Sequence, residues 1–207
     1  TFSQSAKHGA SIGQVHQATK GEQTFAVKVQ YPGVADSLHS DLAVVKPVAL
    51  QMLGLSDMDV EPYFQEVKKR LLEETDYSLE LERSIALSEA TSGKVQGLRF
   101  PTYYPEYSNR RVLTMDWIDG RPLDRFAREE TDQSVKNQVA QAIWDFYQFQ
   151  IHELKQFHAD PHPGNFLVDG ANEVVVLDFG CTKTLDPVFH RDYFRFLDLE
   201  VLNDPEK

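Results

Sequence analysis

Alternating hydrophobic and polar positions predict strands near the start of the chain. In TFAVKVQ, residues 24–30, one face carries a Phe and two Val side chains and the other carries Ala26 and Lys28. Residues 12–18 alternate less regularly. The TKGEQ segment between them contains Gly21 and is typical of a hairpin turn. The pattern therefore predicts an antiparallel pair of strands.

Apolar residues three and four positions apart predict helices over most of the remaining chain, at residues 34–54, 62–91, 132–156 and about 186–202. Pro47 is expected to disturb the first helix, because proline has no backbone N–H to donate. Pro62 is expected in the first turn of the second helix, where a missing N–H costs little. Three further strands are expected, one in residues 110–118 and two in FLVDGANEVVVLDFG, with a turn at residues 170–172. DGRPL is expected to be a short connector.

This order of elements indicates an α+β protein with two lobes. We expect an N-lobe at residues 1–118, with an antiparallel sheet and long helices, and a mostly helical partial C-lobe at residues 119–207. The hinge is expected near residues 116–121, and sites commonly lie in the cleft between such lobes.

Composition restricts the function classes. The 207 residues are 41% hydrophobic and carry a formal net charge of -11, with no basic run, which disfavours a nucleic-acid partner. The single cysteine, Cys181, excludes an intrachain disulfide and is typical of a reducing compartment. The sequence contains no run of eighteen apolar residues, so it predicts no membrane-spanning helix. Anionic nucleotides remain possible ligands if backbone N–H groups or a cation offset the charge.

Lys28 is the first candidate for chemistry. A lone lysine on a strand is usually solvated, but V-A-I-K strands of kinases carry the lysine that binds nucleotide phosphates. The preceding loop, AKHGASIGQVH, contains the small residues Ala10 and Ser11 and allows close approach of a phosphate, although it lacks the G-x-G-x-x-G pattern. Glu80 on the following helix is the expected partner of Lys28, whereas most other carboxylates of that helix are expected to face solvent.

Spacing in the second half strengthens this hypothesis. Asn165 follows Asp160 by five residues, as in the kinase pattern H-R-D-x-x-x-x-N, and Asp178 begins a D-F-G motif after two predicted strands. Asp160 would accept a proton or orient the attacking group. Asp178 would bind the Mg²⁺ that bridges the phosphates, and Asn165 would hold a second metal ion.

A metal site is the alternative for the segment FHADPHPGNF. His158, Asp160 and His162 alternate as ligands on one side of a strand would. Pro161 and Pro163 both lack an N–H, however, which disfavours a regular strand, and no further Cys or His completes a tetrahedral zinc site. We expect a hydrogen bond for His158 and a packing role for His162.

The combination of segments resembles one family. ASIGQVHQA, FAVKVQYPGV, EETDYSLE, VLTMDWIDG, FHADPHPGN and VVLDFG, along nearly the whole chain, are similar to the UbiB/ADCK (AarF-type) atypical kinases. The resemblance implies a protein-kinase-like fold, of which this chain is a central fragment truncated at both ends. It also implies binding of ATP or ADP with Mg²⁺, and a role in the biosynthesis of ubiquinone or other isoprenoid lipids.

By position, the resemblance implies roles for individual residues. Ala10 and Ser11 match the alanine-rich loop that replaces the glycine-rich loop, and Lys28 with Glu80 matches the nucleotide lysine and its partner. Glu74 and Asp76 match an E-x-D motif of the family. These two residues, and Asp116 near the hinge, are expected to bind the cofactor. The catalytic and metal residues are matched by Asp160, Asn165 and Asp178.

Two departures from the family bear on activity. His8-Gly9-Ala10-Ser11 replaces the usual Ala-Ala-Ala-Ser, and the N-terminal K-x-G-Q segment of the family is absent from this sequence. Ala159 stands where regulated protein kinases have Arg, and no A-P-E follows D-F-G, so we expect little phosphorylation of proteins.

The expected partners are a nucleotide, isoprenoid or quinone-precursor lipids and lipid-biosynthesis proteins. The expected location is the cytoplasm, peripheral to the inner membrane in a bacterium, or the matrix side of mitochondria in a eukaryote. A small-molecule kinase of the aminoglycoside or choline type and a non-catalytic nucleotide-binding scaffold remain the alternatives.

Overall fold

The computed structural model describes residues 1–54 and 57–195, and the chain divides into two units. The first unit comprises Thr1–Glu89, Phe100–Asp119 and Asp178–Cys181. The second comprises Ala90–Arg99, Gly120–Leu177 and the chain from Thr182 onward. One boundary between the units lies at Asp119–Gly120, and others follow Glu89, Arg99, Leu177 and Cys181. Two short segments depart from the expected division at residue 118: residues 90–99 belong to the second unit, and residues 178–181 belong to the first.

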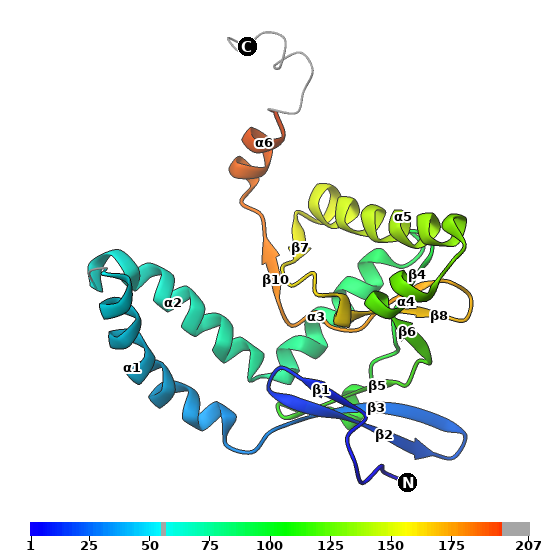
Figure 1. The fold of residues 1–207 in the computed structure, drawn as a ribbon, viewed down its shortest axis with the longest axis horizontal. Helices are drawn as coiled ribbons and strands as arrows, with labels where there is room; N and C mark the ends of the chain where they lie inside the picture. The colour runs from blue at the N-terminus through cyan, green and yellow to red at the C-terminus, as the bar shows by residue number, and fades with distance from the viewer. Residues whose placement is uncertain (55–56, 196–207) are drawn as a thin grey trace. The chain divides into compact units, whose positions relative to one another are not determined.

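The first unit contains a four-stranded antiparallel sheet in the order β1-β2-β3-β5 (Figure 1). Its strands are β1 (His8–Ala10), β2 (Gly13–Lys20), β3 (Gln23–Gln30) and β5 (Val112–Asp116). The predicted strands are confirmed, and so is the turn at Gly21, whose φ of +62° suits glycine. The register places Lys28 between Val15 of β2 and Leu113 of β5.

The face of β3 that carries Lys28 is buried, and on the opposite face Phe25 is buried too. Ala26 and Lys28 are 7% and 8% exposed, whereas Val27 and Val29 are only partly buried. The core on this side consists of Ala26, Tyr77, Tyr103, Leu113 and Met115. A strand lysine is usually solvated, so burial of this one requires partners for its charge.

Three helices follow β3: α1 (Val34–Leu53), α2 (Asp57–Glu74) and α3 (Tyr77–Thr91). Pro47 does not end α1, which continues through it. The prediction of one helix at 62–91 is wrong in two respects: the helical segment begins at Asp57, with Pro62 inside α2, and it breaks before Tyr77. The carboxylate of Asp76 accepts a hydrogen bond from the Ser78 N–H at 3.0 Å, so Asp76 caps a new helix.

Figure 1 shows α1 and α2 side by side as an antiparallel helical hairpin. Lys46 of α1 forms an ion pair with Glu61 of α2 and lies over the ring of Phe64, 5.1 Å from its centroid. Across the described residues, no helix is both long enough and apolar enough to cross a membrane.

The second unit contains a four-stranded sheet in the order β4-β9-β8-β6. Its strands are β4 (Leu98–Arg99), β9 (Val174–Val176), β8 (Phe166–Asp169) and β6 (Gly120–Pro122). The predicted hairpin of β8 and β9 is confirmed. The expected connector DGRPL instead supplies β6, because Gly120–Pro122 pairs with β8. A separate pair joins β7 (Gln156–His158) to β10 (Thr182–Thr184).

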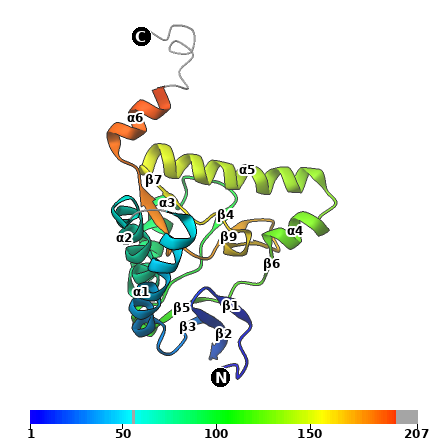
Figure 2. The same cartoon turned by 60° about the vertical axis from the view of Figure 1, so that its left-hand side comes forward.

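Helices of the second unit are α4 (Leu123–Glu129), α5 (Gln133–Phe149) and α6 (Pro187–Arg195). Figure 2 shows α5 beside the sheet, where it contacts β4 and β9. The helix predicted at 132–156 is confirmed as far as Phe149, after which a π-helical turn covers Gln150–Leu154. The last predicted helix is seen as α6, and its residues 196–202 lie outside the described residues.

Candidate active site

Lys28 lies at the centre of a cluster of charges in the first unit. Its Nζ donates hydrogen bonds to Oε1 and Oε2 of Glu80, at 2.8 and 2.9 Å, and to Oδ2 of Asp178 at 3.1 Å. β3 supplies the lysine, α3 supplies Glu80, and the D-F-G segment supplies Asp178. The structure thus brings together three residues that the sequence analysis selected from separate motifs.

The charges of this cluster shift the pKa of its members. Burial alone would lower the pKa of Lys28, but the carboxylates of Glu80 and Asp178 outweigh it and hold the pKa above its usual range. Burial raises the pKa of Glu80 to about 7, and the Asp178 carboxylate adds to this against the opposing effect of Lys28. One ammonium is therefore shared by two carboxylates, and the repulsion between them, which helps to raise the pKa of Glu80, would be relieved by a bound cation.

Tyr77 is a member of the cluster that sequence reasoning missed. Its ring centroid lies 4.9 Å from the Nζ of Lys28, and burial raises the pKa of its hydroxyl to about 12. Tyr77 precedes Glu80 by three residues on α3, and residues at that spacing share one helix face. The spacing to Glu80 is the signal that could have identified it.

The D-F-G segment is fixed on both sides of its glycine. The Gly180 N–H donates to Oδ1 of Asp178 at 2.7 Å, and the Gly180 carbonyl accepts a hydrogen bond from Arg83 at 2.8 Å. Phe179 is fully buried, with its ring 5.7 Å from that of Phe100. Arg83 was not selected from the sequence, where it is one of many charged residues on a helix.

The predicted phosphate loop forms the tip of the β1–β2 hairpin. Ala10 pairs with Gly13, and Ser11 and Ile12 form the two-residue turn. Gly13 has a packing reason to be glycine: a Cβ there would lie 2.4 Å from the Val29 carbonyl oxygen and 2.7 Å from the Tyr77 hydroxyl. The role of Ala10 and Ser11 in nucleotide binding stays a prediction.

The E-x-D residues differ in their surroundings. Glu74 ends α2, and its charge contributes to raising the pKa of Glu80. Asp76 caps α3 and forms an ion pair with Arg110 at 3.4 Å. Asp76 also lines a pocket of ≈ 430 Å³, together with Gln65, Lys68, Lys69, Leu72, Glu73, Leu79 and Arg110.

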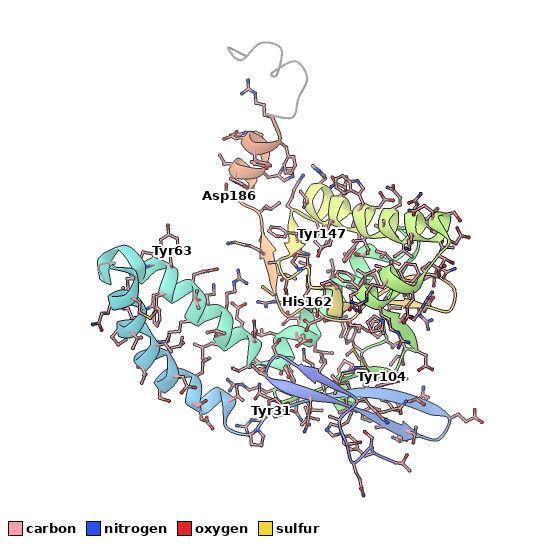
Figure 3. The ribbon with its side chains drawn as sticks, viewed as in Figure 1. Tyr31, Tyr63, Tyr104, Tyr147, His162 and Asp186 are labelled. Atoms are coloured by element: carbon pink, nitrogen blue, oxygen red, sulfur yellow. The ribbon has the colours of Figure 1, made fainter. Side chains whose placement is uncertain are left out.

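Asp116 at the end of β5 holds the neighbouring loop. Its carboxylate accepts hydrogen bonds from the Thr102 N–H at 3.0 Å and from the hydroxyl of Tyr104 at 2.8 Å; Figure 3 labels Tyr104. These bonds give Asp116 a structural role, and its assignment to cofactor binding stays a prediction.

In the second unit, Asp160 and Asn165 form a pair. The side-chain N–H₂ of Asn165 donates to Oδ2 and to the backbone carbonyl of Asp160, both at 3.2 Å. The Asn165 carbonyl accepts a hydrogen bond from the Leu177 N–H at 2.9 Å, which fixes the loop to the end of β9. A short 3-10 turn over Pro163–Asn165 gives the segment its shape.

The two histidines of the segment FHADPHPGNF take part in local hydrogen bonds. His158 is 1% exposed, and its backbone N–H donates to the side-chain oxygen of Gln150, which lies in the π-helical turn. Nδ1 of His162 accepts a hydrogen bond from the Gly164 N–H at 3.0 Å; Figure 3 labels His162. Among the described residues, no group of three or more His, Cys, Asp or Glu side chains is placed to hold a metal ion.

The donor set fits Mg²⁺ brought by a nucleotide. In the first unit, Asp178 offers a carboxylate to a cation. In the second unit, the bond from Asn165 to Asp160 uses the amide nitrogen, and the amide oxygen is of the type that binds a cation. Mg²⁺ prefers oxygen ligands and commonly binds one or two carboxylates together with substrate phosphates. A buried ammonium beside a metal-binding carboxylate is the arrangement that holds nucleotide phosphates in kinases.

Comparison with known proteins gives matches along the whole chain. The family model of the ABC1 atypical kinase-like domain matches residues 1–207. The probable serine/threonine-protein kinase abkA of Dictyostelium discoideum is 30% identical, over 94% of this chain and 37% of its own length. The mitochondrial atypical kinase COQ8B of Danio rerio is also 30% identical, over 94% of this chain and 31% of its own length.

A solved structure agrees with these matches. The complex of Rv3197 with erythromycin from Mycobacterium tuberculosis superposes with a TM-score of 0.73 at 29% identity, and covers 89% of this chain and 46% of that one. The chain therefore spans less than half the length of each of these relatives, and its fold is kinase-like. Together with the family model, these similarities show that the chain belongs to the ABC1 atypical kinase-like family.

Proposed function

We propose that this chain binds Mg²⁺-ATP and transfers or hydrolyses its terminal phosphate. The cluster of Lys28, Glu80 and Asp178 carries the proposal. Because the two carboxylates hold the pKa of Lys28 above its usual range, the buried ammonium stays charged at neutral pH and attracts phosphate oxygens. Glu80 holds the amine through two hydrogen bonds, so a phosphate meets a lysine that is already in place.

Asp160 and Asn165 would supply the rest of the chemistry. Asp160 would orient the attacking hydroxyl or water and accept its proton, since its carboxylate is exposed and is held by the side chain of Asn165. Mg²⁺ held by Asp178 would neutralise charge on the phosphates, and Asn165 would hold a second metal ion. Ala10 and Ser11 would cover the phosphates through the backbone of the β1–β2 turn.

The acceptor we propose is water or a small isoprenoid lipid, in support of ubiquinone or related lipid synthesis. One relative is named an atypical kinase and another a probable serine/threonine-protein kinase, so the preference for a non-protein acceptor comes from this chain's own sequence. The chain lacks the Arg before Asp160 that phosphorylated activation loops bind. Such a substrate implies association with a membrane surface.

Thermal denaturation with ATP or ADP, with and without Mg²⁺, tests the nucleotide site. We expect Mg²⁺-nucleotide to stabilise the wild type, and Lys28→Met and Asp178→Asn to abolish that gain. Lys20→Met is the matched control, because Lys20 is an exposed strand lysine bonded to Tyr107. Failure of Mg²⁺-nucleotide to stabilise the wild type would contradict the proposal.

The acceptor is tested by ADP release with isoprenoid phenols, with amino alcohols and with no acceptor. Stimulation by the phenols supports the lipid role, whereas stimulation by the amino alcohols indicates a small-molecule kinase. Strong transfer of radiolabelled phosphate to a generic protein would contradict the expected weakness toward proteins.

A further inference from the structure

Arg83 bridges α2 and the D-F-G segment. One guanidinium nitrogen donates to the Gly180 carbonyl at 2.8 Å, and another donates to Oε2 of Glu73 at 2.7 Å. The side chains of Arg83 and Glu73 are 28% and 17% exposed. Because this ion pair is partly buried and charge-assisted, its hydrogen bonds are stronger than those of a surface pair.

Arg83 stabilises the charged form of the Glu73 carboxyl group. Burial would raise the pKa of the Glu73 carboxyl, but the hydrogen bond and charge of Arg83 outweigh burial and lower it. Arg70 adds a second, longer ion pair to the same carboxylate at 3.5 Å. The Arg83 guanidinium is thus fixed from the α2 side and presents its remaining donors to Gly180.

The hydrogen bonds continue from Gly180 to the metal-binding carboxylate. The Gly180 N–H donates to Oδ1 of Asp178 at 2.7 Å, and Oδ2 of the same carboxylate accepts from Lys28 at 3.1 Å. A Cβ on Gly180 would lie 3.2 Å from Oδ1 of Asp178, so the backbone approaches the carboxylate closely. A shift of the Gly180 backbone would therefore change the orientation of the Asp178 carboxylate.

α3 holds the segment in two places. Glu80 and Arg83 are three residues apart and share a helix face. Glu80 acts on Asp178 through Lys28, and Arg83 acts directly on Gly180. The nucleotide lysine and the D-F-G backbone are therefore positioned by the same helix.

We propose that Arg83, held by Glu73, is a positioning residue that orients the Asp178 carboxylate for Mg²⁺. This inference rests on the proposed function, because it assigns Mg²⁺ to Asp178. It predicts that loss of Arg83 weakens the use of Mg²⁺ while leaving the lysine pair with Glu80 in place. It also predicts increased motion of the Gly180 backbone whether or not a nucleotide binds.

The first test is independent of nucleotide. Hydrogen exchange of peptides covering residues 178–181 is compared in the wild type, Arg83→Met and Arg125→Met. Arg125 is the matched control, since it forms an exposed ion pair with Glu129 on α4. We expect Arg83→Met to speed exchange at Gly180 by about tenfold, the effect of losing one charge-assisted hydrogen bond. Unchanged exchange in a folded Arg83→Met protein overturns the inference, whatever the nucleotide results.

The second test measures Mg²⁺ dependence. The Mg²⁺ concentration for half-maximal stabilisation by ATP should rise about tenfold in Arg83→Met, with metal-free ATP binding and the Arg125→Met control unchanged. Glu73→Gln should shift it in the same direction by less. In the Asp178→Asn background, Arg83→Met should add nothing, because the carboxylate that it orients is gone.

Other outcomes separate this inference from the proposed function. An equal loss of metal-free and Mg²⁺-dependent ATP binding would show a general structural role for Arg83 and overturn the inference. No ATP binding by the wild type would contradict the proposed function, while the exchange test would still decide whether Arg83 restrains Gly180. If Arg83→Met does not fold, Arg83→Lys, which cannot bridge both partners, takes its place in both tests.

Discussion

The Nζ of Lys28 lies 2.8 Å from Oε1 of Glu80, with 10% and 7% of the two side chains exposed. The pair joins the central strand β3 to helix α3 beneath the sheet. Because each charge would be costly to bury alone, removal of either partner should affect both stability and the proposed nucleotide site.

Glu80 should make stability depend on pH. Its pKa is raised from 4.5 to about 7 in the folded chain, first by burial and then by Asp178. Between these values the folded chain binds more protons than the unfolded chain, so the free energy of unfolding falls as pH rises. We expect Glu80→Gln to reduce this fall by on the order of 1–3 kcal/mol.

Urea unfolding from pH 4.5 to 7.5, without metal or nucleotide, measures the effect of Glu80→Gln. Glu82→Gln, an exposed change on the same helix, is the control and should keep the wild-type slope. A Glu80→Gln slope equal to that of the wild type would show that Glu80 does not titrate in this range.

Gly13→Ala should destabilise the first unit. The new methyl group would meet the Val29 carbonyl oxygen at 2.4 Å, and backbone in a sheet cannot move aside easily. We expect a loss of about 1–3 kcal/mol, as for other overpacked sites. Gly9→Ala on the neighbouring strand has nothing within 4 Å of its Cβ and should change stability little, so equal effects of the two changes would refute the packing explanation.

Gln150→Leu should destabilise the second unit at the π-helical turn. The side-chain oxygen of Gln150 is the acceptor for the buried His158 N–H at 2.9 Å, and leucine of similar volume cannot accept. An unsatisfied buried N–H costs about 1–3 kcal/mol. Thermal unfolding checks this, with Gln141→Leu on the exposed face of α5 as the control. A Tm equal to that of the wild type would mean that His158 finds another acceptor.

Asp160→Asn and Asp178→Asn should separate catalysis from metal binding. Asp160→Asn should keep Mg²⁺-ATP binding and lower turnover by about 10²–10⁴-fold, the usual contribution of general base catalysis. Asp178→Asn should remove the Mg²⁺ dependence of binding. Steady-state ATP hydrolysis and isothermal titration distinguish the two, and unchanged turnover in Asp160→Asn would exclude its proposed role.

Local patterns predicted the elements well where turn residues mark their ends. Alternation located β2, β3 and β5, and Gly21 marked the turn between the first two. The break between α2 and α3 was missed because no Gly or Pro marks it in the sequence. Its signal was present in Asp76, a residue type that favours helix caps.

Motif spacing selected the site residues but not the residues that hold them in position. Lys28, Glu80 and Asp178 could be chosen because kinase motifs fix their residue types and order. Arg83 could not, since its role depends on which face of α3 lies under the sheet. A helical pattern dense in charged residues does not reveal that face.

The sequence by itself determined the main strands and helices, the kinase-like motifs and the five-residue spacing of Asp160 and Asn165 in one short loop. Only the tertiary structure decided that the face of β3 with Lys28 is buried, and that Arg83 contacts Gly180 from a position 97 residues away. The physical reason is that periodicity and spacing record short-range geometry. Burial, pKa shifts and long-range hydrogen bonds arise only when distant segments pack together and exclude water.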